Sequence, residues 1–216
     1  MTIEALIKAV PPPTPPRGAF HGPWEPIEAI VGTRLPPDYK DFVRVYGAGY
    51  FIGFLGINVP RSSNPNTRFE TDVPQIAAAF IDVEELPYPL WPDPQGLLPF
   101  GGTDNGDYLF WLPRGAPEDW GIVVWDRGMC SFEAFDCDLT SFLAGLATGE
   151  LLPMEFPEDL LPCDEMFRPQ EDQAVHRRDR PGGPASIAVS LQLSWRFGGY
   201  GTGQSGVSEL RLREED

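Results

Sequence analysis

The 216-residue chain contains only three cysteines, two histidines and two lysines. Cys130, Cys137 and Cys163 form no Cys-x-x-Cys pair, and their odd number argues against a framework of disulfide bonds. The protein is therefore expected in the cytoplasm. His21 and His176 stand alone in stretches rich in proline, glycine or charge, so no metal site is predicted.

Long apolar runs are missing too, since none approaches the ~18 residues that a membrane-spanning helix needs. The segment from Thr2 to Val10 is too short for a secretory signal and carries Glu4. These two observations predict that the protein has no membrane role.

Positive charge is scarce, and the formal net charge is −16. Between Glu70 and Asp138, fourteen acidic residues face only two arginines, Arg114 and Arg127. The negative electrostatic field of these residues repels the phosphate backbones of nucleic acids and attracts basic proteins. We therefore expect no direct nucleic-acid binding and favour a basic protein partner. The alternative is that the acidic surface only keeps the chain in solution.

Motifs for catalysis are also lacking. No Gly-x-Ser-x-Gly motif occurs, and neither histidine lies beside a serine or cysteine in a strand-turn-helix context. Gly201–Gly206 matches a dinucleotide fingerprint, but only ten residues follow it, too few for the rest of that unit. Asp104–Asp107 has some character of a calcium loop, yet Gly115 stands where the final glutamate belongs. We expect neither enzymatic activity nor a cofactor.

What the chain does contain is a helix–strand unit from Leu35 to Pro60. Pro36 and Pro37 suit the first turn of a helix, and Gly47 can adopt the left-handed conformation that ends one. The apolar run from Tyr50 to Val59 then predicts one buried strand. The apolar face of the helix follows the i, i+3, i+4, i+7 spacing and consists of Tyr39, Phe42, Val43 and Tyr46.

Two further stretches complete a recognisable order. Asn105-Gly106 separates two apolar runs, which is a strong hairpin signal. Phe132–Phe135 then predicts a strand, and Asp138–Gly149 predicts a closing helix with one apolar face. Together with the Leu35–Pro60 unit, these stretches resemble the SUKH superfamily over roughly residues 24–147.

That superfamily is known from fungal cell-wall-assembly regulators and from bacterial immunity proteins that neutralise polymorphic toxins. The resemblance implies an α+β fold, in which helices pack on one side of an antiparallel sheet. It also implies a binding protein without catalytic activity. Because immunity surfaces vary with their toxins, the resemblance carries over no partner-contact residue.

Three regions follow from the pattern of the chain. Residues 1–23 hold a short amphipathic helix and the linker Pro11–Pro16, whose prolines impose an extended spacer. This helix is therefore expected to be a detachable arm. Residues 24–150 form the SUKH-like domain, and residues 151–216 form an irregular connector and a C-terminal β extension.

The C-terminal extension carries the clearest period-two alternation, from Ile187 to Trp195. This predicts a strand that either joins the main sheet or forms a hairpin with Val207–Leu212. Within the domain, helices are also predicted at Trp24–Val31, stopped by Gly32, and at Pro74–Leu86. The β-branched and aromatic run Trp120–Trp125 predicts a central strand of an antiparallel meander.

Tryptophans alternate with acidic residues near the middle of the chain. An aromatic anchor ringed by carboxylates has the composition of a binding hot spot for a basic partner. The competing interpretation is that these tryptophans pack in the core. The predicted partner-binding residues are Asp104, Asp107, Trp111, Glu118, Asp119, Trp120 and Asp126.

The sequence thus predicts an immunity-type protein that binds and neutralises a cognate toxin domain, a basic nuclease-like one, by steric and electrostatic occlusion. A regulatory interaction scaffold of the same fold is the alternative. An enzyme that uses His176 or a pair of carboxylates is a third class, and nothing in the sequence indicates its substrate.

Overall fold

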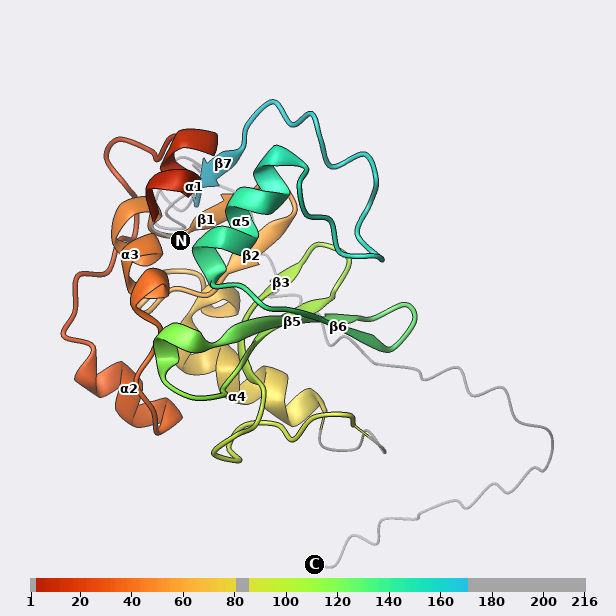
Figure 1. The fold of residues 1–216 in the computed structure, drawn as a ribbon. Helices are drawn as coiled ribbons and strands as arrows, with labels where there is room; N and C mark the ends of the chain where they lie inside the picture. Colours follow the sequence, from red (N-terminus) through yellow and green to blue (C-terminus); the bar gives the residue numbers. More distant parts are fainter. Residues whose placement is uncertain (1–2, 81–85, 171–216) are drawn as a thin grey trace, which may run out of the picture. The chain divides into compact units, whose positions relative to one another are not determined.

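An antiparallel sheet forms the framework of the chain in the computed structural model, which describes residues 3–80 and 86–170 (Figure 1). In these residues the sheet has seven strands in the order β6-β5-β4-β3-β2-β1-β7. The first six form a meander, and β7 returns to pair with β1. The α+β class is thereby confirmed. The strands are β1 Gly49–Phe51, β2 Leu55–Ile57, β3 Leu98–Thr103, β4 Tyr108–Leu112, β5 Gly121–Asp126, β6 Ser131–Phe135 and β7 Phe167–Pro169.

Tight turns connect three pairs of strands, β1–β2, β3–β4 and β5–β6, and the first of these turns was not expected. The predicted hairpin at Asn105-Gly106 joins β3 to β4, and Gly106 has a φ of +89°. The prediction of a single strand from Tyr50 to Val59 is wrong, because two strands, β1 and β2, occupy this run. Ile52 and Gly53 lie between them with φ values of +47° and +63°, which reverse the chain into a second hairpin.

Five α-helices lie within the described residues, and local signals explain most of their boundaries. Gly32 and Gly149 end α2 and α5 in the left-handed conformation, and Asp138 caps the start of α5. The helix predicted from Pro74 instead begins at Phe69, because its buried side chains outweigh the N–H that Pro74 lacks. The helices are α1 Ile3–Ala9, α2 Glu25–Val31, α3 Pro37–Tyr46, α4 Phe69–Ala79 and α5 Leu139–Thr148, with 3-10 turns η1 Pro65–Thr67 and η2 Pro117–Asp119.

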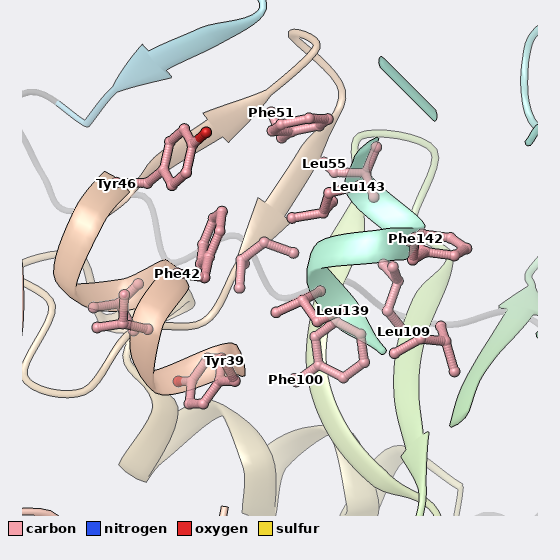
Figure 2. Close-up of a cluster of buried hydrophobic side chains, with 14 of the residues drawn as sticks. Tyr39, Phe42, Tyr46, Phe51, Leu55, Phe100, Leu109, Leu139, Phe142 and Leu143 are labelled. Carbon is pink, nitrogen blue, oxygen red and sulfur yellow. The ribbon is translucent and has the colours of Figure 1, made fainter. Parts of the chain in front are cut away.

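The main core lies between the sheet and helices α1, α3 and α5, and Figure 2 shows its centre. The four predicted apolar residues of α3 are all buried, with rings that contact neighbouring aromatics. Opposite them, α5 contributes buried side chains from a second apolar stripe. Each ring removes a large apolar area from water, so this cluster dominates the stability of the domain. The α5 residues are Leu139, Phe142, Leu143 and Leu146.

The second face of the sheet is covered as well, which refines the expected arrangement of helices on one side. In β4, the consecutive residues Leu109, Phe110 and Trp111 are all buried. Successive strand residues point to opposite faces, so both faces must be covered. Phe110 belongs to a separate smaller cluster with Ile76 and Phe80 from the C-terminal part of the α4 region.

The N-terminal helix is not a detachable arm. Leu6 is fully buried, and α1 packs against α5 and α3. The Tyr46 hydroxyl donates a 2.6 Å hydrogen bond to the Val10 carbonyl oxygen, which anchors the end of the helix. Beyond the prolines, the Ala48 N–H donates to the Arg17 carbonyl oxygen at 2.8 Å. The prediction failed because an amphipathic helix buries its apolar stripe whenever the domain offers a complementary face.

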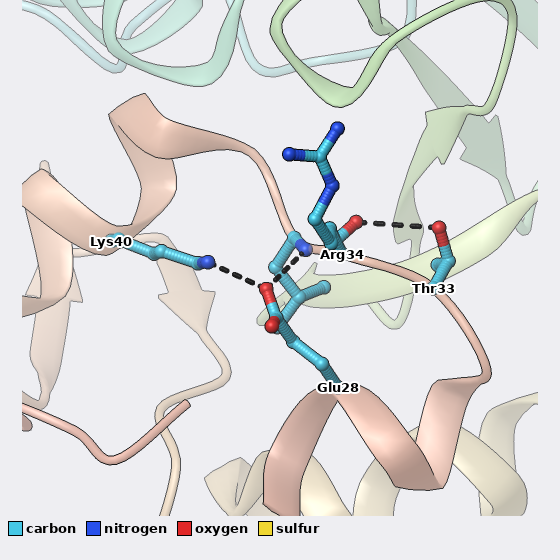
Figure 3. A network of polar contacts seen from close by, with 5 residues as sticks. Glu28, Thr33, Arg34 and Lys40 are labelled. Carbon is cyan, nitrogen blue, oxygen red and sulfur yellow. Dashed lines mark hydrogen bonds and ion pairs between the residues drawn. The ribbon is translucent and has the colours of Figure 1, made fainter. Parts of the chain in front are cut away.

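A polar contact fixes how α2 meets α3. Glu28 of α2 accepts hydrogen bonds from the Lys40 ammonium at 2.5 Å and from the Leu35 N–H at 2.8 Å (Figure 3). Burial acts to raise the pKa of Glu28, but these bonds and the nearby cations outweigh it, so the pKa is lowered. Lys40 also lies over the Trp24 ring, 5.3 Å from its centre.

The connector after residue 150 contributes one element that the sequence did not reveal. The three residues of β7 pair with β1, and a strand this short that ends at Pro169 leaves no period-two signal. The predicted strands Ile187–Trp195 and Val207–Leu212 lie outside the described residues.

Candidate functional site

Three of the predicted partner-binding residues lie at one end of the sheet, at the hairpin turns. Asp104 is exposed and Asp126 is half-buried, whereas Asp107 is only 2% exposed. Asp107 accepts hydrogen bonds from the Thr103 hydroxyl at 2.6 Å and from the Arg127 N–H at 3.1 Å. Asp107 therefore ties the β3–β4 turn to the β5–β6 turn and does not present its carboxylate to a partner.

The two predicted tryptophans lie in the core. Trp111 is 1% exposed and Trp120 is 4% exposed. The Trp111 ring lies 4.5 Å from Phe100 and 4.9 Å from Tyr39, between centroids. Because both tryptophans are buried, neither lies on a contact surface. This agrees with the competing interpretation, in which these tryptophans pack in the core.

Glu118 and Asp119 lie at the opposite end of the sheet. Both belong to η2, which connects β4 to β5, and both are exposed. The length of β4 separates them from Asp104, and five strand residues at ~3.4 Å each span about 17 Å. The seven predicted residues therefore do not form one surface.

At the η2 end, the fold gathers carboxylates that are distant in sequence. They line a pocket of about 410 Å³. Glu4 comes from α1, Asp38 and Asp41 come from α3, Glu118 comes from η2, and Asp138 precedes α5. We call these five residues and the space between them the acidic pocket. Its other lining residues are Ile3 and Pro37.

The floor of the acidic pocket is built by hydrogen bonds between helix starts. Asp38 accepts a bond from the Thr140 N–H at 3.0 Å, and Asp138 accepts one from the Ser141 N–H at 2.7 Å. Burial, aided by the charge of Asp138, raises the pKa of Asp38. Burial acts in the same direction on Asp138, but the hydrogen bonds that it accepts prevail and lower its pKa. The two carboxylates thus stabilise the starts of α3 and α5 while they face the pocket.

A neighbouring cation compensates part of the charge of the pocket. Arg44 forms an ion pair with Asp41 on the surface of α3. Lys40 is the neighbour of Asp41 in sequence, but it pairs with Glu28, which does not line the pocket. Five carboxylates in one concave site attract ammonium and guanidinium groups and repel anions.

Sequence reasoning found Glu118 but missed the other four carboxylates of the pocket. In the sequence, Asp38 is only a favourable acidic residue at the start of a helix, and Glu4 only argues against a signal peptide. The available signal was that three predicted helices each begin beside an acidic residue. Only the packing of α1 and α3 against α5 brings those starts together.

The residue types present give little support for a metal or a reactive thiol. Within residues 3–80 and 86–170, no three His, Cys, Asp or Glu side chains are grouped so that they could hold a metal ion. All three cysteines are free. Burial, with the charges of Asp138 and Asp136, raises the pKa of the Cys137 thiol to about 11, which disfavours the nucleophilic thiolate. In the part of the chain that the structure describes, no helix is both long and apolar enough to cross a membrane.

Comparison with known proteins identifies the family. No curated protein and no solved structure matches the chain. A family model, SUKH_6, described as SMI1-KNR4 cell-wall, matches residues 23–143, which is more than half of the sequence. The match begins just before α2 and ends within α5, so it includes every pocket carboxylate except Glu4. The chain therefore belongs to the SUKH_6 family, within the SUKH superfamily.

Proposed function

We propose that this protein is a non-catalytic, cytoplasmic immunity-type protein that binds and neutralises a cognate toxin domain. The proposed toxin is basic and nuclease-like, because a domain that acts on nucleic acid carries positive charge around its active site. Family membership supports a role in protein–protein interaction. The net charge of −16 favours a basic partner over nucleic acid.

The convergence of five carboxylates on the acidic pocket carries this proposal. These residues come from four separate elements, and Lys40, the sequence neighbour of Asp41, pairs with Glu28. We call Asp41 and Glu118, which line the pocket, and Asp119, which follows Glu118 in η2, the rim. All three residues are at least partly exposed. Arginine or lysine side chains around a toxin active site would pair with this rim.

Neutralisation follows from occlusion. The acidic pocket steers the basic partner into an encounter, which raises the association rate at low ionic strength. Contact around the rim then places the body of this protein over the toxin active site and blocks the nucleic-acid substrate. The mechanism requires neither a cofactor nor a reaction.

The test is co-expression with the C-terminal domain of a secreted protein encoded by the adjacent gene, scored by cell survival and by co-purification. The pocket variant is Asp41→Asn with Glu118→Gln and Asp119→Asn. Its control, Asp93→Asn with Glu158→Gln and Asp159→Asn, removes the same charge from exposed residues outside the pocket. We expect the native protein and the control to protect, and the pocket variant to bind about 10- to 100-fold more weakly.

Two outcomes would contradict the proposal. Equal protection by the pocket variant and the control would remove the acidic pocket from the mechanism. If the native protein neither rescues the cells nor forms a complex, the regulatory scaffold is favoured instead. An adjacent gene that encodes a large secreted protein with a variable C-terminal domain favours immunity, whereas an isolated gene leaves scaffolding open.

A further inference from the structure

The sheet has an open edge at β6. In the described residues β6 pairs with β5 alone, and no other described segment forms backbone hydrogen bonds with its outer side. An unpaired strand edge is a template for another strand. The opposite edge is less suitable, because β7 has three residues and ends at Pro169, which has no N–H. Of the two edges, β6 is therefore the one on which a further strand can form a regular ladder.

A groove of about 160 Å³ lies against the β5–β6 hairpin. A cavity of about 150 Å³ holds a benzene molecule, so this groove has room for one large apolar side chain. It is too small for a typical small-molecule ligand, whose pocket spans about 300–1,000 Å³. The apolar wall includes Phe132, Met154 and Phe156, and the carboxylates that line the groove belong to Asp126, Glu133 and Glu155.

The groove is already formed in the unbound protein. Phe156 packs against Phe54 with 5.1 Å between ring centroids, which fixes the segment that makes the outer wall. The Met154 N–H donates a 2.8 Å hydrogen bond to the Glu133 carboxylate, which joins that wall to β6. Met154 is 80% exposed. A preformed groove with an adaptable methionine at its rim lowers the ordering cost of binding.

Charge selects between two occupants of this edge. A second copy of the chain, paired symmetrically on β6, would place Glu133 opposite its own copy at the centre of the strand. Like charges in directly opposed positions destabilise an antiparallel pair. A basic segment would meet Glu133, Asp126 and Glu155 with opposite charge.

We propose that β6 and the groove beside it bind an extended basic segment of a partner protein, which adds a strand to the sheet and inserts one apolar side chain into the groove. Backbone bonds to β6 supply affinity, and the groove and its carboxylates supply selectivity. This surface is distinct from the acidic pocket. Only the identification of this partner with the toxin rests on the proposed function.

The probe is a nine-residue peptide in which arginine and valine alternate, added to the full-length protein. Two control peptides carry glutamate in place of arginine, or N-methyl groups on alternate residues, which remove backbone donors. Binding is measured by fluorescence polarisation, and amide hydrogen exchange locates the contact. The variant Glu155→Lys changes a groove residue, and its matched control Glu158→Lys changes an exposed glutamate that does not line the groove.

We expect the arginine–valine peptide to protect amides of residues 131–135 and both control peptides to bind at least tenfold more weakly. Glu155→Lys should weaken binding about tenfold, and Glu158→Lys less than twofold. Undiminished binding of the N-methylated peptide, absence of binding, or protection confined to the starts of α1, α3 and α5 would overturn the inference. The last result would leave the acidic-pocket proposal intact. Protection at β6 without rescue in co-expression would instead overturn only the toxin assignment.

Discussion

Replacing Leu6 by alanine tests whether the N-terminal helix belongs to the folded core. Leu6 is fully buried in the main hydrophobic cluster, although it is only the sixth residue of the sequence. Two consequences follow from this packing. The substitution must lower the free energy of unfolding of the whole domain, and it must do so in a single transition.

The size of the effect follows from burial. Leucine-to-alanine substitutions in protein cores cost about 2–5 kcal/mol, depending on how far the surroundings collapse into the cavity. The helix has only seven residues, but the Tyr46–Val10 hydrogen bond holds its end, which limits that collapse. We therefore expect a loss of about 3 kcal/mol. For a domain of this size, that loss lowers the Tm by about 6–12 °C.

Urea denaturation followed by tryptophan fluorescence measures this loss. Lys8→Ala is the control on the same helix, because Lys8 is exposed, and it should change stability by less than about 0.5 kcal/mol. The slope of the transition should stay the same in both variants. A loss below about 1 kcal/mol for Leu6→Ala, or a separate early transition, would refute the reasoning and restore the detachable arm.

Two further predictions concern the backbone and one buried carboxyl. Gly47→Ala should cost more than about 3 kcal/mol, since the added Cβ would lie 2.0 Å from the Arg17 carbonyl oxygen, whereas Gly32→Ala, with a similar φ and open space, should cost about 1 kcal/mol. Equal losses in urea denaturation would contradict this difference. Burial raises the pKa of Asp72 to about 6, so the folded state binds the proton of this carboxyl group more tightly than the unfolded state does. The free energy of unfolding therefore falls as pH rises from about 4 to above 6, because Asp72 ionises over this range. Allowing for partial solvent exposure, Asp72→Asn should stabilise the protein by roughly 1–2 kcal/mol at pH 7.5 and by almost nothing at pH 3.5; destabilisation at pH 7.5 would show that the charge itself is useful.

Features that depend on neighbouring residues could be predicted from the sequence. The four apolar residues of α3 are buried as their spacing indicates. Asp138 and Gly149 bound α5 as capping residues should, and Asn105-Gly106 forms its hairpin. Each of these signals lies within about ten residues, and the order of the elements was enough for the family resemblance.

Features that depend on distant packing could not be predicted in the same way. A proline-rich linker indicates an extended segment, but it does not reveal that Arg17 accepts a bond from Ala48. The acidic pocket unites Glu4 with Asp138, and nothing in the local sequence of either residue indicates the other. The prediction that Trp111 and Trp120 contact a partner was wrong for a related reason, since both are buried. Composition places aromatic and acidic residues near each other, whereas the strand period decides which of them reach the surface.

The acidic pocket separates into parts with different freedom to change. Asp38 and Asp138 hold the starts of α3 and α5, so substitutions there alter the fold together with the charge. Asp41, Glu118 and Asp119 form the rim, and within residues 3–80 and 86–170 none of their carboxylates accepts a hydrogen bond from a buried neighbour. Substitutions can therefore change the charge and shape of the rim with little loss of stability. A lineage with this fold can follow a changing partner by exchanging rim residues one at a time, while the scaffold beneath stays constant.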